Sequence, residues 1–309
     1  MTQKNIHNKA ASVHQKLLNL AKERQRPFNE LLQLYGIERF LYRLSQSQHR
    51  NRFVLKGGLA LLVWNTLLTR PTRDIDLLGK IHNDLDLVRE IIAQICTQKV
   101  EDDGIVFDES TITTQRIVED ADYHGVRTLF TGFLGNARIP MQIDMGFDDV
   151  ITPAPVQIVY PGLLTNPTAS LLAYNPETSI AEKLEAMISI GQLNSRMKDF
   201  FDIWILARTR DFEGKNLADA IRKTFERRKT TITSAPACFS LPPDKAKESQ
   251  WKAFIRSSQL TNAPVDFAEI ISCLRDFLQP VLSAIENRQD FSGIWKSSGP
   301  WINSDKHTA

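Results

Sequence analysis

The chain has 309 residues, of which 42% are hydrophobic, and a formal net charge of +2, as is typical of a globular protein with a sizeable core. A charge this close to balance excludes a strongly basic or acidic molecule, so a nucleic-acid partner would have to be bound by local clusters of basic residues. Three scattered cysteines, no long apolar stretch and no apolar leader at the N-terminus favour a cytoplasmic protein without disulfides or a membrane partner.

The first half of the chain predicts an α/β region. Helical periodicity over residues 9–47, interrupted at Pro27, predicts two helices. A short buried strand, 53–55, follows and ends at a pair of glycines. Residues 59–68 predict a helix, 74–79 a second strand, and 84–98 a helix that covers it. Four further strands are predicted at 110–120, 125–135, 138–147 and 155–161.

The second half of the chain predicts helices. Residues 179–191 begin with Ser179-x-x-Glu182, the pattern of a capping box, and end at Gly191. Further helices are predicted at 197–208, 217–228, 248–257 and 266–278, and the tail from residue 296 onward is expected to be poorly ordered. We therefore expect two domains, residues 1–165 and residues 166–309.

Two aspartates, Asp74 and Asp76, stand two residues apart in the second predicted strand. Side chains at this spacing share one face of a strand, and two carboxylates so close repel each other unless a cation lies between them. Mg²⁺ would supply that charge, since it binds a few carboxylates together with substrate phosphates. The alternative is a solvated edge strand with two exposed acids. Asp144, on the polar face of the strand 138–147, is a candidate third ligand or an ordinary outward-facing acid.

The glycine pair, Gly57 and Gly58, lies at a strand-to-helix turn and follows Lys56. Bare glycine backbone at a helix N-terminus lets a phosphate approach closely. Each motif is weak alone, but the order of strand, glycine pair, helix, and strand with two aspartates is more specific. Three carboxylates on adjacent strands suit two-metal chemistry on a phosphate ester or anhydride.

The segments "LKGG…RPTRDIDLL", "DYHGVR", "RIPMQIDMGF", "SIAEKLEAMISIG" and "NSRMKDFFDIW", in this order, resemble the AbiEii/AbiGii toxins of the DNA polymerase β-like nucleotidyltransferase superfamily. The resemblance implies an α+β fold: a nucleotidyltransferase core with a mixed sheet and flanking helices, and a helical C-terminal domain that contributes to the active-site cleft. It implies transfer of NMP from an NTP, with Mg²⁺ or Mn²⁺, to a tRNA or other RNA 3′ end by a toxin of a toxin–antitoxin or phage-defence system, with a possible cognate antitoxin.

The resemblance also implies roles for particular residues. The two glycines would bind the triphosphate and the aspartate pair would bind metal, while the functional lysine and aspartate of the helical domain match Lys183 and Asp199, with Asp202 as an alternative. From the residues alone, Lys183 is a solvated charge. Asp199 and Asp202 share a helix face with Arg196, as either an ion pair that stabilises the helix or part of a site.

Basic residues supply the remaining candidates. Arg73, beside the aspartate pair, is a candidate nucleotide-binding residue, as is Arg196. A basic cluster is either a solvated helix surface or a binding site for RNA or nucleotide phosphates, and it consists of Arg222, Lys223, Arg227, Arg228 and Lys229. Within it, Arg227 and Arg228 are the candidate nucleotide-binding residues.

Two positions depart from the family pattern. Leu59 stands where many superfamily members have a serine that contacts phosphate, and Asp148 replaces a glycine at an expected tight turn. Alternatives to transfer onto RNA are transfer onto protein hydroxyls and a degenerate protein that only binds nucleotide or RNA.

Overall fold

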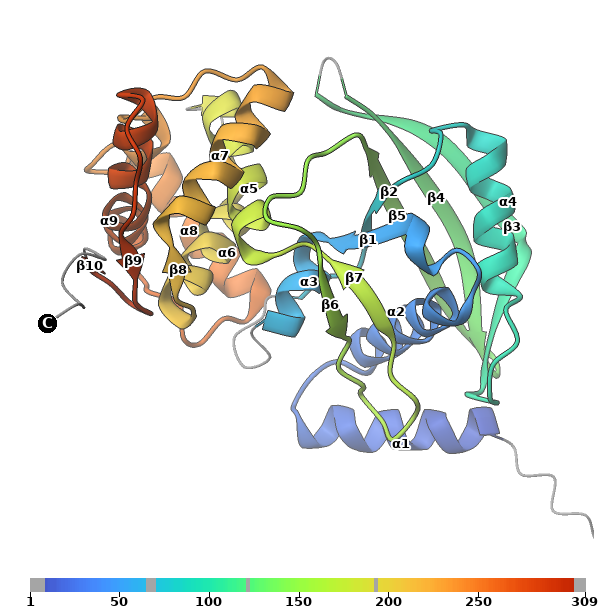
Figure 1. The fold of residues 1–309 in the computed structure, drawn as a ribbon. Helices are drawn as coiled ribbons and strands as arrows, with labels where there is room; N and C mark the ends of the chain where they lie inside the picture. Colours follow the sequence, from blue (N-terminus) through green and yellow to red (C-terminus); the bar gives the residue numbers. More distant parts are fainter. Residues whose placement is uncertain (1–8, 65–70, 121–122, 192–193, 303–309) are drawn as a thin grey trace, which may run out of the picture. The chain divides into compact units, whose positions relative to one another are not determined.

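The structure is a computed structural model that describes residues 9–64, 71–120, 123–191 and 194–302. Its chain forms two compact units (Figure 1). The first comprises Met1–Leu59, Thr72–Asp148 and Gln157–Ala173, and the second comprises Ala60–Pro71, Asp149–Val156 and Tyr174–Ala309. Both units are therefore assembled from segments that alternate along the chain, rather than from one segment on either side of residue 165.

The first unit contains a seven-stranded mixed sheet with the strand order β3-β4-β5-β2-β1-β7-β6. β2 is parallel to β5 and β1 is parallel to β7, whereas the pairs β1–β2, β3–β4 and β4–β5 are antiparallel. The strands are β1 (Phe53–Lys56), β2 (Ile75–Gly79), β3 (Ile105–Asp120), β4 (Tyr123–Leu134), β5 (Ala137–Phe147), β6 (Val156–Val159) and β7 (Ser170–Ala173).

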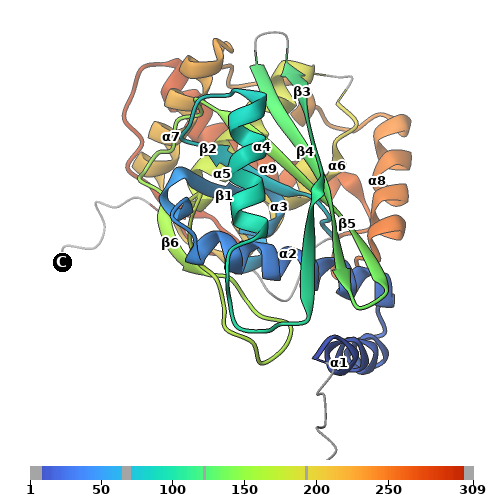
Figure 2. The same cartoon turned by 90° about the vertical axis from the view of Figure 1, so that its right-hand side faces the viewer.

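One face of this sheet is apolar and is covered by helices α2 (Phe28–Gln46) and α4 (Leu85–Cys96), and Figure 2 shows α4 lying along the strands. On α2, Phe40 packs against Phe107 of β3 and Phe130 of β4, with ring centroids 5.9 and 5.5 Å apart. Because side chains alternate across a strand, the polar residues between these apolar positions point to the opposite face. Helix α1 (Lys9–Glu23) packs on α2.

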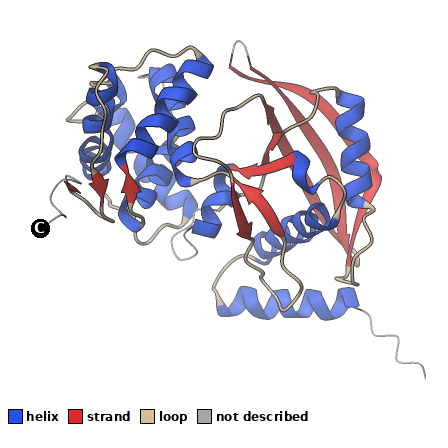
Figure 3. Cartoon of the chain, viewed as in Figure 1, coloured by secondary structure: helices blue, strands red, loops and turns tan. Residues whose placement is uncertain are grey.

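The second unit is mainly helical (Figure 3). Its core includes the fully buried aromatic side chains of Phe200, Trp251, Phe267 and Phe277. A small antiparallel sheet with the order β10-β9-β8 closes on this core. The elements are α5 (Pro176–Ile190), α6 (Met197–Thr209), β8 (Phe212–Glu213), α7 (Gly214–Arg228), α8 (Lys245–Ser258), α9 (Phe267–Glu286), β9 (Ile294–Trp295) and β10 (Trp301–Ile302).

The predicted capping box at Ser179 and Glu182 is wrong. Helix α5 begins one turn earlier, where the side chain of Asn175 accepts a hydrogen bond of 2.7 Å from the backbone N–H of Thr178 and Pro176 occupies the first turn. Ser179 instead donates to the Asn175 carbonyl. The predicted end at Gly191 is confirmed, since this residue caps the helix with φ +64°.

The predicted disorder from residue 296 onward is also wrong as far as Ile302. Trp301 packs on Phe277 at 5.7 Å between ring centroids and donates its indole N–H to the Phe277 carbonyl at 2.8 Å. Trp295 is buried and donates to the Ala207 carbonyl at 2.7 Å. Residues 303–309 lie outside the described part of the chain.

The predicted fold class, α+β with a mixed sheet and flanking helices plus a helical part, is confirmed. The sequence did not predict β7, which lies between β1 and β6 in the sheet. The predicted helix 59–68 corresponds to α3 (Gly57–Trp64), and its last residues fall outside the described ones. Among the helices that the structure describes, none is long and apolar enough to cross a membrane.

Candidate active site

A row of charged and polar side chains crosses five neighbouring strands of the first unit on the face opposite α2 and α4. The strand registers pair Lys56 with Asp76, Asp76 with Asp144, Asp144 with Arg127, and Arg127 with Gln115. Paired positions in a sheet lie about 5 Å apart, so these side chains are neighbours. We call Lys56, Asp76, Asp144, Arg127 and Gln115 the cross-strand row.

Asp76 and Asp144 occupy the places in this row that the sequence predicts. They stand at the same level of the parallel strands β2 and β5, and both side chains are only partly buried. Asp74 lies just before β2 and is exposed. The sequence thus correctly places Asp144 on a strand next to the one that carries Asp76.

Gly57 makes a close approach to Asp76. A Cβ atom on this glycine would lie 1.9 Å from Oδ2 of Asp76, and the glycine has φ +67°, a conformation that L side chains rarely adopt. Gly57 therefore leaves room for the Asp76 carboxylate at the point where β1 passes into α3. Lys56, which precedes it, is buried opposite Asp76.

Asp144 is bound by nitrogen donors. Arg127 donates from Nε to Oδ1 and from Nη2 to Oδ2, both at 2.8 Å, and Gln142 donates to Oδ2 at 3.1 Å. The two parallel hydrogen bonds form the bidentate geometry that makes arginine–carboxylate pairs strong and directional. The segment before β2 is connected to β5 by Gln33, whose side-chain nitrogen donates to the carbonyls of Pro140 at 2.8 Å and Arg73 at 3.5 Å.

A second charged cluster lies in the helical unit, on α5 and α6. The ammonium of Lys183 donates to Oδ1 of Asp199 at 3.1 Å and to Oδ2 of Asp202 at 2.7 Å. Both aspartates are buried, and Arg196 Nε lies 2.8 Å from the other oxygen of Asp199. The structure therefore brings together all four of these predicted residues, and Lys183 is not a solvated charge.

Arg228 lies among three carboxylates of the same unit. Its guanidinium donates to Glu185 at 2.8 Å and lies 3.4 Å from Asp149 and 3.6 Å from Glu182. Burial opposes its charge, but Glu182, Asp149 and Glu185 together raise the pKa of Arg228 above its ordinary value. The hydroxyl of Tyr174 donates to Glu182 at 2.9 Å. By contrast, Arg227 is exposed.

A family model described as "Nucleotidyl transferase AbiEii toxin, Type IV TA system" matches residues 39–273, which is most of the chain. The chain belongs to this AbiEii family. It is therefore a nucleotidyltransferase and a toxin of a type IV toxin–antitoxin system, and the family implies an NTP substrate and a cognate antitoxin.

Two solved structures from Helicobacter pylori are similar to this AbiEii toxin. JHP933 is 15% identical, with 88% of this chain and 94% of that chain covered and a TM-score of 0.44. A protein described as a nucleotidyltransferase candidate is 14% identical, with 94% and 100% covered and a TM-score of 0.43. No curated protein matches the chain.

The two departures from the family pattern have structural consequences. Asp148, directly after β5, has φ +63°, a backbone conformation in which glycine is favoured although this residue is not glycine. Leu59 is completely buried. A leucine packed into the core has no hydroxyl to contact phosphate, unlike the serine that the superfamily pattern implies at this position.

The sequence did not single out Arg127, Gln142, Asp149, Tyr174 or Glu185 of this AbiEii toxin. Arg127 lies within the segment "DYHGVR" on which the resemblance partly rests, but its role is visible only from the strand register. Glu185 is buried under Arg228 and also accepts a hydrogen bond from the hydroxyl of Thr230 at 2.5 Å.

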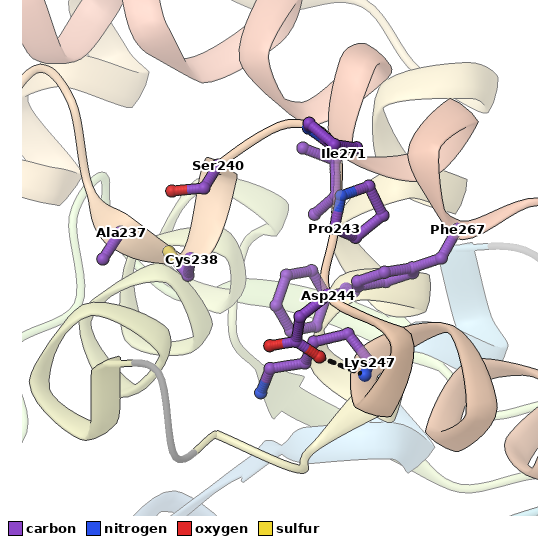
Figure 4. A pocket seen from close by; sticks show the side chains of 10 residues that line it. Ala237, Cys238, Ser240, Pro243, Asp244, Lys247, Phe267 and Ile271 are labelled. Carbon is purple, nitrogen blue, oxygen red and sulfur yellow. Dashed lines mark hydrogen bonds between the residues drawn. The ribbon is translucent and has the colours of Figure 1, made fainter.

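A separate cavity of about 310 Å³ lies in the helical unit (Figure 4). It contains none of the predicted site residues. Lys247 at its edge donates to the carbonyl of Asn194, and burial raises the pKa of the Cys238 thiol to about 12, which keeps it protonated near neutral pH. The lining residues are Phe200, Ala237, Cys238, Ser240, Pro242, Pro243, Asp244, Lys247, Phe267 and Ile271.

Proposed function

We propose that this AbiEii toxin transfers NMP from an NTP to the 3′ end of a tRNA or another RNA, with a divalent cation, at the cross-strand row. The observation that carries the proposal is the register of Asp76 and Asp144 on one sheet face, with Gly57 packed against Asp76. Carboxylates on adjacent strands beside a glycine turn are suited to metal-assisted phosphoryl chemistry.

The acidic residues of the site differ in how well they could bind a divalent cation. Within the described ranges, no group of three His, Cys, Asp or Glu side chains is arranged to hold a metal ion. The partial exposure of the Asp76 carboxylate suits Mg²⁺ or Mn²⁺, with Asp74 as a further ligand. Asp144, the proposed third ligand, is occupied by Arg127. When bound, the cation would stabilise charge on the phosphates and activate the attacking hydroxyl.

The chain's own residues would position the nucleotide. We assign the triphosphate to the buried Lys56 and to the backbone of Gly57 and Gly58 at the start of α3, where helix N–H groups and lysine both favour an anion. In the reaction, the acceptor hydroxyl oxygen forms a bond to the α-phosphorus, the bond to pyrophosphate breaks, and the hydroxyl proton is released to solvent.

The remaining assignments are proposals of the same kind. Lys183 and Asp199 are proposed catalytic residues, and their hydrogen bond supports their acting together. Arg73, Arg196 and Asp202 are proposed nucleotide-binding residues. Arg227 and Arg228 are proposed for the same role. Arg227 suits this role better because it is exposed, whereas Arg228 is surrounded by three carboxylates.

The proposal is tested by incubating the purified chain with total tRNA and each α-³²P-labelled NTP in turn, in Mg²⁺ or Mn²⁺. We expect label in RNA, lost on nuclease treatment but not on protease treatment. Label that survives nuclease and migrates with protein would instead favour transfer to protein hydroxyls, and nucleotide binding without turnover would favour a degenerate protein.

The Asp76→Asn variant should lose incorporation by at least about a thousandfold and should no longer inhibit growth when expressed, because the carboxylate charge that attracts the cation is removed. Asp86→Asn removes a carboxylate from an exposed position on α4 and is the matched control. Transfer by Asp76→Asn at the level of the Asp86→Asn control would refute the assignment.

A further inference from the structure

Arg127 and Asp144 of the cross-strand row form an ion pair with two hydrogen bonds. Both bonds are 2.8 Å long, and the Asp144 side chain is 13% exposed whereas that of Arg127 is 34% exposed. The carboxylate is therefore held in the sheet, while part of the guanidinium is accessible. Arginine is well suited to exchange one anion for another, because its fork fits phosphate as well as carboxylate.

Arg127 balances part of the negative charge in the cross-strand row. Asp76 and Asp144 stand at the same level of neighbouring strands, so their negative charges repel each other. Lys56 is paired in register with Asp76 on one side, and Arg127 is bound to Asp144 on the other. Two positive and two negative groups thus make a row of zero net charge without any added ion.

The hydrogen bonds also limit what Asp144 can do as a ligand. An ionised carboxylate offers about four lone-pair positions. Arg127 uses two of them and Gln142 uses a third. A cation that binds Asp144 would have to approach beside a guanidinium of the same sign of charge, or displace it.

We propose that Arg127 acts as a built-in counter-ion: it competes with the divalent cation for Asp144 and exchanges Asp144 for the phosphates of the nucleotide. Without nucleotide, a cation binds through Asp74 and Asp76 only. With nucleotide, Arg127 moves to phosphate and Asp144 becomes a ligand. The inference rests on the proposed function, because it concerns the cation and the NTP of that same site.

The test is Mn²⁺ binding to the full-length chain without nucleotide, measured by electron paramagnetic resonance. Arg127→Gln should bind Mn²⁺ about tenfold tighter than the unmodified chain or bind one additional ion, since a hydrogen-bonded counter-ion contributes roughly this much to an equilibrium constant. The double variant Arg127→Gln/Asp144→Asn should lose that gain. Arg138→Gln is the matched control, because Arg138 lies on the same face of β5, six residues from Asp144, and is exposed.

The second part of the test adds a nucleotide. An α,β-methylene NTP, which cannot be cleaved at that bond, should increase Mn²⁺ binding to the unmodified chain but have a smaller effect on Arg127→Gln, where Asp144 is already available. If Arg127→Gln does not fold, as judged by circular dichroism, Arg127→Lys takes its place; it keeps the charge but cannot form two parallel hydrogen bonds, and should show a smaller gain in the same direction.

Unchanged or weaker Mn²⁺ binding by Arg127→Gln would overturn the proposal, as would a gain that persists in the double variant or an equal gain in Arg138→Gln. So would the absence of Mn²⁺ binding in every variant. These results are independent of the labelled-nucleotide assay: incorporation by the unmodified chain would still support the transferase, with Arg127 then fixing Asp144 permanently as a structural group.

Discussion

Gly57 shows how a single backbone position can control a carboxylate. Two separate constraints act on it: a positive φ, and the contact of 1.9 Å that any Cβ would make with Oδ2 of Asp76. The first is a cost to the backbone of about 1 kcal/mol for an L residue. The second displaces the carboxylate on which the proposed cation site depends.

We predict that Gly57→Ala reduces nucleotide transfer by at least about a hundredfold, because a shift of an ångström at a catalytic group has effects of that size. Gly135→Ala is the matched control. Gly135 has φ +58°, but its nearest neighbour, Cβ of Ala10, is 3.8 Å from the added atom, so it bears the backbone strain without the clash. Activity assays and thermal unfolding of both variants provide the comparison, and equal loss of activity in the two would contradict the role given to the Asp76 contact.

Among individual residues, the sequence predicted the acidic side chains of the site better than it predicted the residues that bind them. Strand alternation places Asp76 and Asp144 on polar faces, and the resemblance supplies their order. Arg127 required the register of the β4–β5 hairpin. Its turn, Gly135 and Asn136, lies between the paired residues Leu134 and Ala137; counting seven residues away from each gives Arg127 opposite Asp144. A glycine–asparagine pair between two strands is a hairpin signal, so this pairing was within reach of the sequence.

At the scale of elements, the pairing of α5 with α6 depends on charges that are removed from water. Lys183 is the cation that lies between Asp199 and Asp202, and the exposed fractions of these two carboxylates are 0% and 2%. Arg196 Nε also lies 2.8 Å from Asp199. A buried ion pair of this kind contributes little net stability when complete, but removing one partner leaves an uncompensated charge.

Lys183→Met should therefore lower the free energy of unfolding by about 3 to 5 kcal/mol, measured by urea denaturation. Lys252→Met makes the same change at an exposed position of α8 and should alter stability by no more than about 0.5 kcal/mol. Adding Asp202→Asn to Lys183→Met should restore part of the loss, because one of the two buried negative charges is then gone. If the double variant were less stable than Lys183→Met, the loss could not be due to uncompensated charge.

The elements that the sequence missed share a physical cause. Hydrophobic periodicity predicted the long helices, but β7 is only four residues long and follows a proline-rich stretch, so its place between β1 and β6 is set by tertiary pairing. The C-terminal strands are two residues each and are held by the contacts of Trp295 and Trp301 with α9 and α6 rather than by local propensity. Helix α5 begins earlier than predicted because Asn175 caps the N–H of Thr178 and Pro176 fits the first turn, so Ser179 lies inside the helix.

For the whole molecule, the main feature is the path of the chain. It passes from one unit to the other five times, after residues 59, 71, 148, 156 and 173. Each unit consequently depends on short segments that are distant in sequence. The second unit takes Leu61 into its core and Asp149 into the cluster around Arg228. The first unit takes β7 next to β1.

This path predicts that the two sequence-defined domains, 1–165 and 166–309, will not fold when expressed separately. The first fragment lacks β7, which leaves β1 without its parallel neighbour; the second lacks Leu61 and the segment that contains Thr152, whose backbone N–H donates to Thr178 at 2.9 Å. We expect neither fragment to show cooperative thermal unfolding by circular dichroism. Co-expression should restore it, because all segments of both units are then present.

A chain cut at an inserted protease site after Thr165 is the control, since Thr165 is exposed and lies within a loop of the first unit. This nicked protein should unfold near the temperature of the intact chain, which would show that the missing segments, and not the break itself, prevent the fragments from folding. Cooperative unfolding of fragment 166–309 at the temperature of the intact chain would mean that the segments 60–71 and 149–156 add nothing to the second unit. The unit would then be an independent domain, with its core contacts at Leu61 and its hydrogen bonds at Thr152 dispensable for stability.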